Sequence, residues 1–282
     1  AAVATVDTTN ATDDEKAAEK AVSTEETTPV SEAPEEAAPA KEIAEEAAPV
    51  EEVAEESVTD EPAEKAAEPI ETITKGYILT EIPEESKLGF GRYFTNHMFI
   101  MDYNKAEGWH DARIVPFGNV SLHPASTVLH YGAEIFEGMK AYRAANGKIQ
   151  LFRPMENVKR LNASAERLCL PQIPEEDALE ALTTFVQCEQ DWTPSAPGTS
   201  LYLRPFLYGN DETLGVHAVH NATFVIIASP VGSYYKEGIN PVKIMIEDQD
   251  VRAVRGGTGY AKCGGNYAAS NRAGKRAEEQ GY

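Results

Sequence analysis

The sequence predicts a fold that contains both strands and helices, either α+β or mixed α/β, preceded by a disordered acidic tail. Residues 1–70 consist mainly of Ala, Glu, Pro, Thr and Val, and they contain no aromatic residue. From about Thr72 onwards, short runs of β-branched and aromatic residues are typical of strands. Later stretches carry apolar residues every three or four positions, which is typical of amphipathic helices. Strands and helices mixed in this order indicate an α+β or mixed α/β architecture.

The negative charge is concentrated in the tail. Residues 1–70 hold 21 acidic and 4 basic side chains, whereas residues 71–282 hold 25 acidic and 21 basic ones, within a total net charge of -21. A segment this polar buries too little apolar surface to offset the entropy lost on ordering. We therefore expect a disordered tail and a nearly neutral folded part. A tail that binds a basic partner is the functional alternative.

Several short segments of the folded part are expected to form strands. Residues 136–143 and 149–152 predict a hairpin, because Asn146 and Gly147 between them favour the positive φ angles of tight turns. The other predicted strands are residues 76–80, 97–101, 200–207, 222–228 and 242–246.

Three helices are expected. In the first, Val158, Leu161 and Ala165 recur at helical spacing, and Pro171 is its predicted end. The second begins around Pro174, where the acidic residues 175–177 suit the positive end of a helix. The third covers residues 266–280, which are rich in Ala, Arg and Glu.

Composition argues against several classes of partner. The folded part has no basic patch suited to nucleic acid, and no apolar run long enough to span a bilayer. The three cysteines lack metal-ligand spacing and indicate a reducing, cytoplasmic context. His217 and His220 lie three residues apart without a carboxylate cluster, so we expect no bound metal.

A glycine-rich run at residues 255–267 is the candidate functional segment. It places Lys262 between two pairs of glycines, just before a helix-forming stretch. Glycines let the backbone approach a planar or phosphorylated ligand closely. A lysine amine becomes nucleophilic toward carbonyls when its charged form is disfavoured. This is the chemistry of Schiff-base lysines, and of pyridoxal phosphate enzymes in particular.

Other interpretations of the run are less consistent with its residues. A nucleotide P-loop needs Gly directly before the lysine and Ser or Thr directly after it, whereas Ala261 and Cys263 stand there. The dinucleotide pattern GxGxxG fails because Lys262 occupies the place of its last glycine. On composition alone, a flexible surface loop with a solvated lysine remains an equal alternative.

Six motifs in order resemble the branched-chain amino acid aminotransferases, which are class IV, fold-type IV pyridoxal phosphate enzymes. The resemblance covers about residues 72–282. Its motifs are HYG with IFEGMK (130–132 and 135–140), LFRP (151–154), NVKRL (157–161), LYLRP (201–205), PVGSY (230–234) and the glycine-rich run (256–267).

This resemblance implies a small domain over residues 72–236 and the start of a larger, cofactor-binding domain over residues 237–282. The family's second domain continues well beyond the position of Tyr282. We therefore expect a C-terminally truncated polypeptide that binds cofactor poorly by itself.

The resemblance also implies pyridoxal 5'-phosphate as cofactor and three residues that hold it. Lys262 would form the Schiff base with the cofactor aldehyde and, once displaced by substrate, move a proton between substrate and cofactor. Arg160 would bind the phosphate, which suits a group that is always charged. Tyr267 would bond the ring hydroxyl. The structural alternatives are a surface lysine, an exposed helix arginine and a core aromatic.

Five further residues are implied for the substrate pocket. Tyr131, Phe136, Tyr202 and Tyr234 match aromatic walls, which hold an aliphatic side chain by contact area and exclude water. Arg204 matches the arginine that receives the distal carboxylate of glutamate or 2-oxoglutarate. As isolated aromatics in strand-like segments, the four rings are also compatible with an ordinary core.

The implied activity is amino transfer between leucine, isoleucine or valine and 2-oxoglutarate, with Lys262 as the catalytic residue. The resemblance implies a homodimer when the protein is full length, with pockets near the subunit interface. One alternative is another class IV enzyme, such as a D-amino acid aminotransferase or a lyase. A second is an inactive protein that binds partners through its acidic tail.

Overall fold

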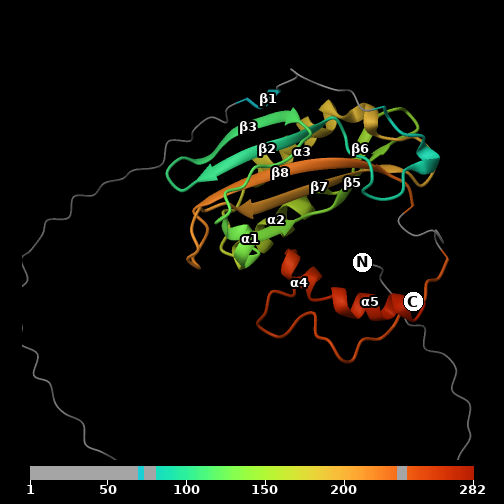
Figure 1. Ribbon diagram of the computed structural model, residues 1–282. Coiled ribbons are helices and arrows are strands. Elements are labelled where there is room, and N and C mark those ends of the chain that lie inside the picture. Colours follow the sequence, from blue (N-terminus) through green and yellow to red (C-terminus); the bar gives the residue numbers. More distant parts are fainter. Residues whose placement is uncertain (1–68, 73–80, 234–239) are drawn as a thin grey trace, which may run out of the picture. The chain divides into compact units, whose positions relative to one another are not determined.

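An eight-stranded, largely antiparallel sheet organises the part of the chain that the structure describes (Figure 1). The structure is a computed structural model that describes residues 69–72, 81–233 and 240–282, all within the unit Pro62–Tyr282. The strand order is β1(Glu71–Thr72), β3(Gly108–Pro116), β2(His97–Asn104), β8(Asn221–Val231), β7(Ser200–Gly209), β5(Met139–Arg143) and β6(Ile149–Leu151). The remaining strand, β4(Glu134–Phe136), pairs with β7 beside this path.

Two predictions from the N-terminal part lie outside the described residues. These are the disordered tail, apart from Pro69 and Ile70, and the strand at residues 76–80. Ile70 packs against the hydrophobic core, and β1 pairs in parallel with β3 directly after it. Ile70, the last residue of the predicted tail, is therefore part of the folded layer.

The predicted strands at residues 97–101, 200–207 and 222–228 are confirmed as parts of β2, β7 and β8. β7 and β8 pair in register from Ser200 opposite Val231 to Gly209 opposite Ala222. The hairpin is confirmed as β5 and β6, and Gly147 in its turn has a φ angle of 81°. Its predicted first strand is interrupted, because Glu137 and Gly138 separate β4 from β5.

Two amphipathic helices supply the other half of the core. They are α2(Pro154–Arg167) and α3(Glu175–Cys188), which confirm that helices form at the first two predicted places. Their apolar faces join one buried cluster with side chains of the sheet, among them Phe99, Leu203 and Phe224. The burial of apolar surface between helices and sheet is the main stabilising contribution to such a layer.

The predicted end of the first helix is wrong. α2 ends at Arg167, four residues before Pro171. Cys169 has a φ angle of 54°, and the N–H of Leu170 donates to the carbonyl of Ala165 at 3.0 Å. A left-handed residue that closes the last turn is a common helix terminator, so the chain turns before the proline is reached.

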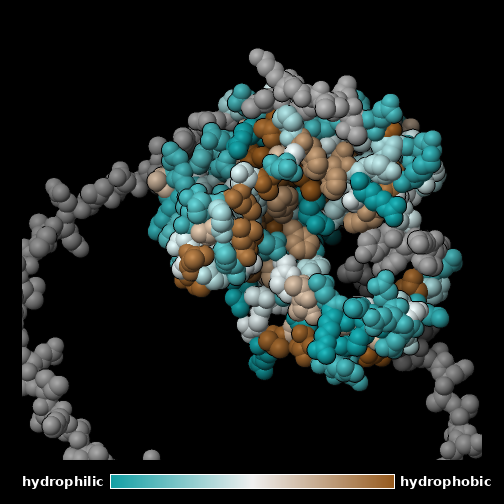
Figure 2. All heavy atoms as spheres, viewed as in Figure 1, coloured by the Kyte–Doolittle hydropathy of each residue, from teal (hydrophilic) through white to brown (hydrophobic). Residues whose placement is uncertain are grey.

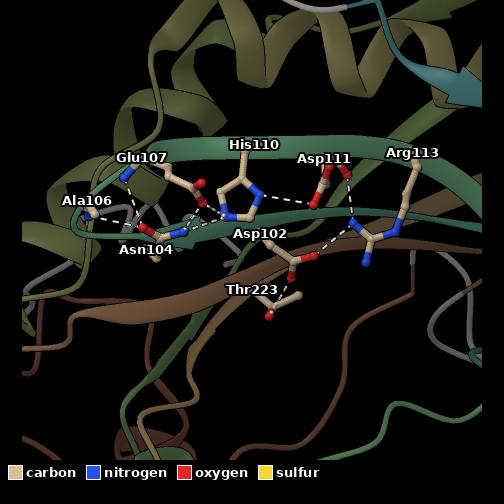
Figure 3. Close-up of polar contacts among 8 residues, drawn as sticks. All are labelled: Asp102, Asn104, Ala106, Glu107, His110, Asp111, Arg113 and Thr223. Carbon is tan, nitrogen blue, oxygen red and sulfur yellow. Dashed lines mark hydrogen bonds and ion pairs between the residues drawn. The ribbon is translucent and has the colours of Figure 1, made fainter.

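β3 was not predicted, and polar cross-strand contacts explain why. Figure 3 shows Arg113 of β3 paired with Asp102 of β2 at 2.8 Å, while Thr223 of β8 donates to the same carboxylate at 3.0 Å. Asn104 donates to His110 at 3.0 Å near the β2–β3 turn. These polar residues mask the alternating pattern that would indicate a strand.

The strand predicted at residues 242–246 is also wrong. The described chain has no regular structure there, and Ile244 and Ile246 are 77% and 91% exposed. Alternating apolar residues favour a strand only where a neighbouring strand pairs with them. Within the described residues, none of the strands pairs with this segment.

The last predicted helix is divided in two. The structure has α4(Gly264–Ala268) and α5(Asn271–Glu279) instead of one helix over residues 266–280. The N–H of Ser270 donates to the carbonyl of Tyr267, and the Ser270 hydroxyl donates to that of Asn266. The side chain thus competes for a carbonyl that a continuous helix would use.

Two short 3-10 helices and one short α-helix complete the described elements. They are η1(Glu85–Lys87), η2(Gln190–Trp192) and α1(Thr127–Tyr131). None of the helices in the described part of the chain is both long and apolar enough to cross a membrane.

Candidate active site

The backbone around Lys262 is fixed to both α2 and β4. The Lys262 N–H donates to the Ser164 hydroxyl of α2 at 2.8 Å, and the Phe136 N–H donates to the Lys262 carbonyl at 2.9 Å. The next residue, Cys263, forms an antiparallel bridge with Ile135. Cys263 and Ile135 are both buried. These contacts hold the lysine against the folded layer although it lies in a loop.

Asn266 closes the loop that carries Lys262. Its side-chain amide donates to the carbonyls of Thr258 and Ala261 at 2.8 Å and 2.7 Å, and it accepts from the Thr258 hydroxyl at 3.0 Å. The Asn266 side chain is buried, so these bonds satisfy it in place of water. The loop between residues 258 and 266 therefore has a defined shape.

The Lys262 amine lies between two aromatic rings. Its Nζ donates to the Tyr267 hydroxyl at 2.5 Å and lies 4.4 Å from the centre of the Phe136 ring. The two rings are themselves 4.9 Å apart. Aromatic faces attract a cation, and the phenol gives the amine a partner that can also exchange protons. The structure thus brings together Lys262, Tyr267 and Phe136.

Arg204 and Tyr202 join this cluster from β7. Their side chains lie two residues apart and so on one face of the strand. Arg204 Nη2 donates to the Tyr202 hydroxyl at 2.9 Å, and the guanidinium lies 4.7 Å from the Phe136 ring centre. Arg204 Nε is buried and has no hydrogen-bond partner among the described residues. The hydrogen bonds of the described residues therefore leave part of the donor capacity of Arg204 unused.

A cavity of about 220 Å³ opens beside Tyr202 and Arg204. Phe90 lines it, and its ring lies 5.0 Å from that of Tyr202. Phe90 was not identified from the sequence. A signal was present, because Gly89 and Gly91 on either side have φ angles of 62° and 66°, which glycine adopts readily.

Arg160 lies on α2 and pairs with Glu137. Its Nε and Nη2 atoms donate to the two carboxylate oxygens at 2.6 Å and 2.9 Å. The hydrogen bond to Glu137 raises the pKa of the Arg160 guanidinium, which therefore keeps its charge. Tyr267 acts on it electrostatically in the same direction but more weakly. Arg160 is thus near the Lys262 cluster, and Glu137 is a second residue that was not identified from the sequence.

Glu134 connects the lysine loop with Arg204. Its carboxylate accepts the N–H of Gly264, two residues after Lys262. Burial raises the pKa of the Glu134 carboxyl, while the Gly264 bond and the charge of Arg204 act in the opposite direction. A Cβ atom on Gly264 would overlap this carboxylate. A side chain at position 264 would therefore require the Glu134 carboxylate to move away from the Gly264 N–H.

Two predicted pocket residues are not in the cluster. Tyr131 is exposed at the end of α1, and its hydroxyl donates to the carbonyl of Leu214. Tyr234 lies outside the described residues. The structure therefore brings together six of the eight predicted site residues, namely Lys262, Tyr267, Phe136, Tyr202, Arg204 and, at its edge, Arg160.

A separate group of possible metal ligands occurs at the end of α3. Ligand-type atoms of His97, Cys188 and Glu189 lie within 4.8 Å of one another. His97 Nδ1 contacts the buried Glu189 carboxylate directly. This contact already accounts for the pair as an ion pair or hydrogen bond. The other histidines considered, His217 and His220, stack at 5.2 Å.

Comparison with known proteins places these features in one family. The family described as "Amino-transferase class IV" matches residues 134–282, which include every residue of the cluster. The chain is 53% identical over 203 residues to "Branched-chain-amino-acid transaminase 1" of Bacillus subtilis (strain 168), and 54% identical over 200 residues to "Branched-chain-amino-acid aminotransferase 2" of the same organism. These alignments cover 72% and 71% of this chain. The chain spans 57% and 55% of the two relatives, or little more than half of their length.

Solved structures show the same fold. A branched-chain aminotransferase from the archaeon Thermoproteus uzoniensis, solved with norvaline, has a TM-score of 0.54 at 25% identity and covers 66% of this chain and 58% of its own. The predicted fold-type IV architecture is thereby confirmed. A second branched-chain amino acid aminotransferase, solved with pyridoxamine 5'-phosphate, has a TM-score of 0.53 at 28% identity, covering 69% and 57%. With a family match over more than half of its residues, this chain belongs to the class IV aminotransferases.

Proposed function

We propose that this chain carries the reactive lysine of a branched-chain-amino-acid transaminase that uses pyridoxal 5'-phosphate and 2-oxoglutarate. The names of the two Bacillus subtilis relatives support the substrate class. The observation that carries the proposal is the Lys262 amine held between the Phe136 ring and the Tyr267 hydroxyl.

The donor set fits the cofactor. Pyridoxal phosphate presents an aldehyde, a ring hydroxyl and a phosphate, and the cluster offers an amine, a phenol and a charged guanidinium to match them. Lys262, Tyr267 and Arg160 would hold these three groups, respectively. When bound, the cofactor supplies an electron-accepting ring that stabilises negative charge on the substrate α-carbon.

In the proposed mechanism, Lys262 moves the proton. Its Nζ would accept the proton of the substrate α-carbon and pass it on to the bound cofactor, which requires an amine that is uncharged for part of the cycle. The Tyr267 hydroxyl orients the amine through their hydrogen bond of 2.5 Å. The Phe136 ring covers one side of the amine at 4.4 Å.

Arg204 allows one pocket to accept two kinds of substrate side chain, aliphatic and carboxylate. An aliphatic side chain contacts the rings of Phe90 and Tyr202 beside the cavity, because apolar walls hold it by contact area. A distal carboxylate instead pairs with the Arg204 guanidinium, whose Nε has no other partner in the described structure. When no carboxylate substrate is bound, the Arg204 guanidinium still has the hydrogen bond to the Tyr202 hydroxyl and the contact with the Phe136 ring.

The remaining expectations are part of the same proposal. Residues 72–236 form the small domain, residues 237–282 begin the large one, and the protein works as a cytoplasmic homodimer. Large apolar side chains reach the surface, as Figure 2 shows for one face, and the exposed ones include Leu129, Tyr131, Leu214 and Val216. Exposed apolar groups of this kind are typical of contact surfaces. Tyr131 and Tyr234 are proposed as pocket walls in that assembly.

Chemical trapping tests the proposal in the full-length protein that contains this chain. Borohydride reduction in the presence of pyridoxal phosphate should label Lys262, as located by peptide mapping. Lys262→Ala should lower transamination of leucine with 2-oxoglutarate by about 10³-fold or more, since it removes the proton-transfer group. The control Lys275→Ala removes an exposed lysine of α5, paired with Glu279 at 3.8 Å, and should have no effect. A label on another lysine would overturn the assignment.

Substrate comparison separates the alternatives. Activity with L-leucine but not D-alanine supports the branched-chain transaminase. Activity with D-alanine alone would indicate a D-amino acid aminotransferase, and absence of both activities with intact cofactor binding would favour a lyase or a binding protein.

A further inference from the structure

We propose that Glu137 is a positioning residue, whose buried carboxylate holds Arg160 in the orientation that binds the cofactor phosphate. This inference rests on the proposed function, in which Arg160 binds that phosphate. Glu137 lies between β4 and β5, in the turn that connects Phe136 with Gly138.

The pairing between Glu137 and Arg160 fixes the orientation of the arginine side chain. Arg160 Nε and Nη2 donate to separate oxygens of Glu137 at 2.6 Å and 2.9 Å, so the guanidinium plane is fixed at two points. The Glu137 side chain is 1% exposed, whereas that of Arg160 is 54% exposed. The arginine is therefore held from inside the protein, and the rest of its donor edge faces outward.

The buried carboxylate is itself held in place by further bonds. Its Oε2 accepts the side-chain amide of Asn157 at 2.8 Å and the N–H of Gly138 at 3.1 Å. The Glu137 N–H donates to the carbonyl of Pro205 at 2.7 Å. A buried charge is tolerated when it is paired and fully hydrogen-bonded. These bonds leave Glu137 little freedom, and that rigidity passes to Arg160.

Arg160 keeps donors for an anion. A guanidinium carries five N–H groups, and the pairing with Glu137 engages Nε and Nη2. The other terminal nitrogen, Nη1, is not used by this pairing. The carboxylate offsets part of the positive charge, so the contribution of Glu137 to phosphate binding is orientation rather than net attraction.

The same turn also contacts the substrate side of the cluster. The Phe136 ring lies 4.4 Å from Lys262 Nζ. A Cβ atom on Gly138 would overlap the Tyr202 hydroxyl. Three consecutive residues thus touch the amine, the phosphate-binding arginine and a pocket wall. A change at Glu137 that only disturbed the fold would therefore affect all three, whereas a positioning role affects the phosphate alone.

Comparing two ligands separates these possibilities. The affinities of the full-length protein for pyridoxal 5'-phosphate and for pyridoxal, which lacks the phosphate, are measured by fluorescence titration. Glu137→Gln should weaken binding of the phosphorylated ligand by about tenfold, a typical loss for a supporting partner, and leave pyridoxal within about twofold. Glu156→Gln is the matched control on the exposed side of α2, where Glu156 pairs loosely with Arg153 at 3.6 Å, and it should change neither affinity.

A double variant tests whether Glu137 influences phosphate binding through Arg160. If Glu137 acts through Arg160, adding Glu137→Gln to Arg160→Ala should weaken phosphate binding no further. Equal weakening for both ligands, or none for either, would overturn the positioning role. If Arg160→Ala alone leaves the preference for the phosphorylated ligand unchanged, the proposed phosphate site is wrong instead.

Arg160→Lys provides the test if Glu137→Gln does not fold. Lysine keeps the charge but cannot form the two-point pairing with Glu137. We expect it to lose most of the phosphate preference, and wild-type affinity in this variant would show that charge without orientation is sufficient.

Discussion

At the scale of single residues, hydrogen-bond partners distinguish the two arginines of the site. Arg160 is paired through both carboxylate oxygens of Glu137. Arg204 instead has a phenol and an aromatic face, and its buried Nε lacks a partner among the described residues. The first arrangement suits a ligand group that stays bound, such as a cofactor phosphate. The second suits a carboxylate that comes and goes with the substrate, because an uncompensated donor gains more from pairing.

Cys188 illustrates how surroundings set reactivity at an exposed position. Desolvation of its sulfur and then the Glu189 carboxylate raise the pKa of the thiol to about 11. At pH 8 the thiolate fraction is thus about 100-fold lower than for a thiol with a pKa of 9. Each thiolate is about tenfold more nucleophilic because its pKa is higher, so the net decrease in reaction rate is about tenfold. Cys188 should therefore react with iodoacetamide about tenfold more slowly than in the urea-unfolded chain, as followed by peptide mass spectrometry. Equal rates in the two states would contradict this.

At the scale of elements, the sequence was informative where a pattern is local. Helices α2 and α3 followed from apolar spacing, and the β5–β6 hairpin from Asn146 and Gly147. The failures involve competing contacts. The segment at residues 242–246 has strand-like alternation but no partner in the described sheet, and Ser270 divides the last helix by bonding Asn266. Neither effect is visible in a hydrophobic pattern.

The attachment of α5 should depend on pH. Arg276 of α5 donates to Asp250 at 2.7 Å and to Glu247 at 2.5 Å. The pKa of the Glu247 carboxyl is lowered from 4.5 to about 2, first by the N–H groups of Asp250 and Gln249 and then by Arg276. A carboxyl with a depressed pKa stabilises the folded state above its ordinary value, and this contribution is lost as the pH falls from about 4.5 toward 2.

Hydrogen exchange of α5, corrected for the intrinsic effect of pH, measures this loss. Protection should fall across that interval in the wild type. Glu247→Gln should already show lower protection at pH 7, and the further fall on acidification should be smaller than in the wild type, because only Asp250 then still pairs with Arg276. Glu279→Gln, which removes an exposed pair with Lys275 at 3.8 Å, is the control and should resemble the wild type. Protection that is constant from pH 5 to pH 2 would exclude a role for Glu247.

At the scale of the whole molecule, the site is assembled from segments far apart in the chain. Motifs indicated Lys262, Phe136, Tyr202, Arg204, Arg160 and Tyr267 one by one, and their proximity came only with the structure. The residues that connect them were missed. Ser164 meets Lys262 across 98 positions, and Glu134 meets Gly264 across 130. A lone serine on a helix or a lone glutamate on a strand has no local signature of such a role.

Ser164 should therefore control how firmly the lysine loop is held to the sheet-and-helix layer. Its hydroxyl is buried in α2 and accepts the Lys262 N–H at 2.8 Å. Ser164→Ala leaves that N–H without its partner, which costs roughly 1 kcal/mol, or about fivefold in local opening. Hydrogen exchange of residues 258–266 should accelerate by about that factor, while exchange in β7 and β8 stays unchanged.

Ser200→Ala provides a control of matched burial. Ser200 is 1% exposed in β7, and its hydroxyl has no hydrogen-bond partner among the described residues. Removing it should leave exchange in the lysine loop as in the wild type, because no contact with Lys262 is lost. If Ser164→Ala and Ser200→Ala gave the same small change, the loop would be held by the bridge between Ile135 and Cys263 rather than by α2. A selective effect of Ser164→Ala would show that packing between α2 and the loop sets the position of the Lys262 amine.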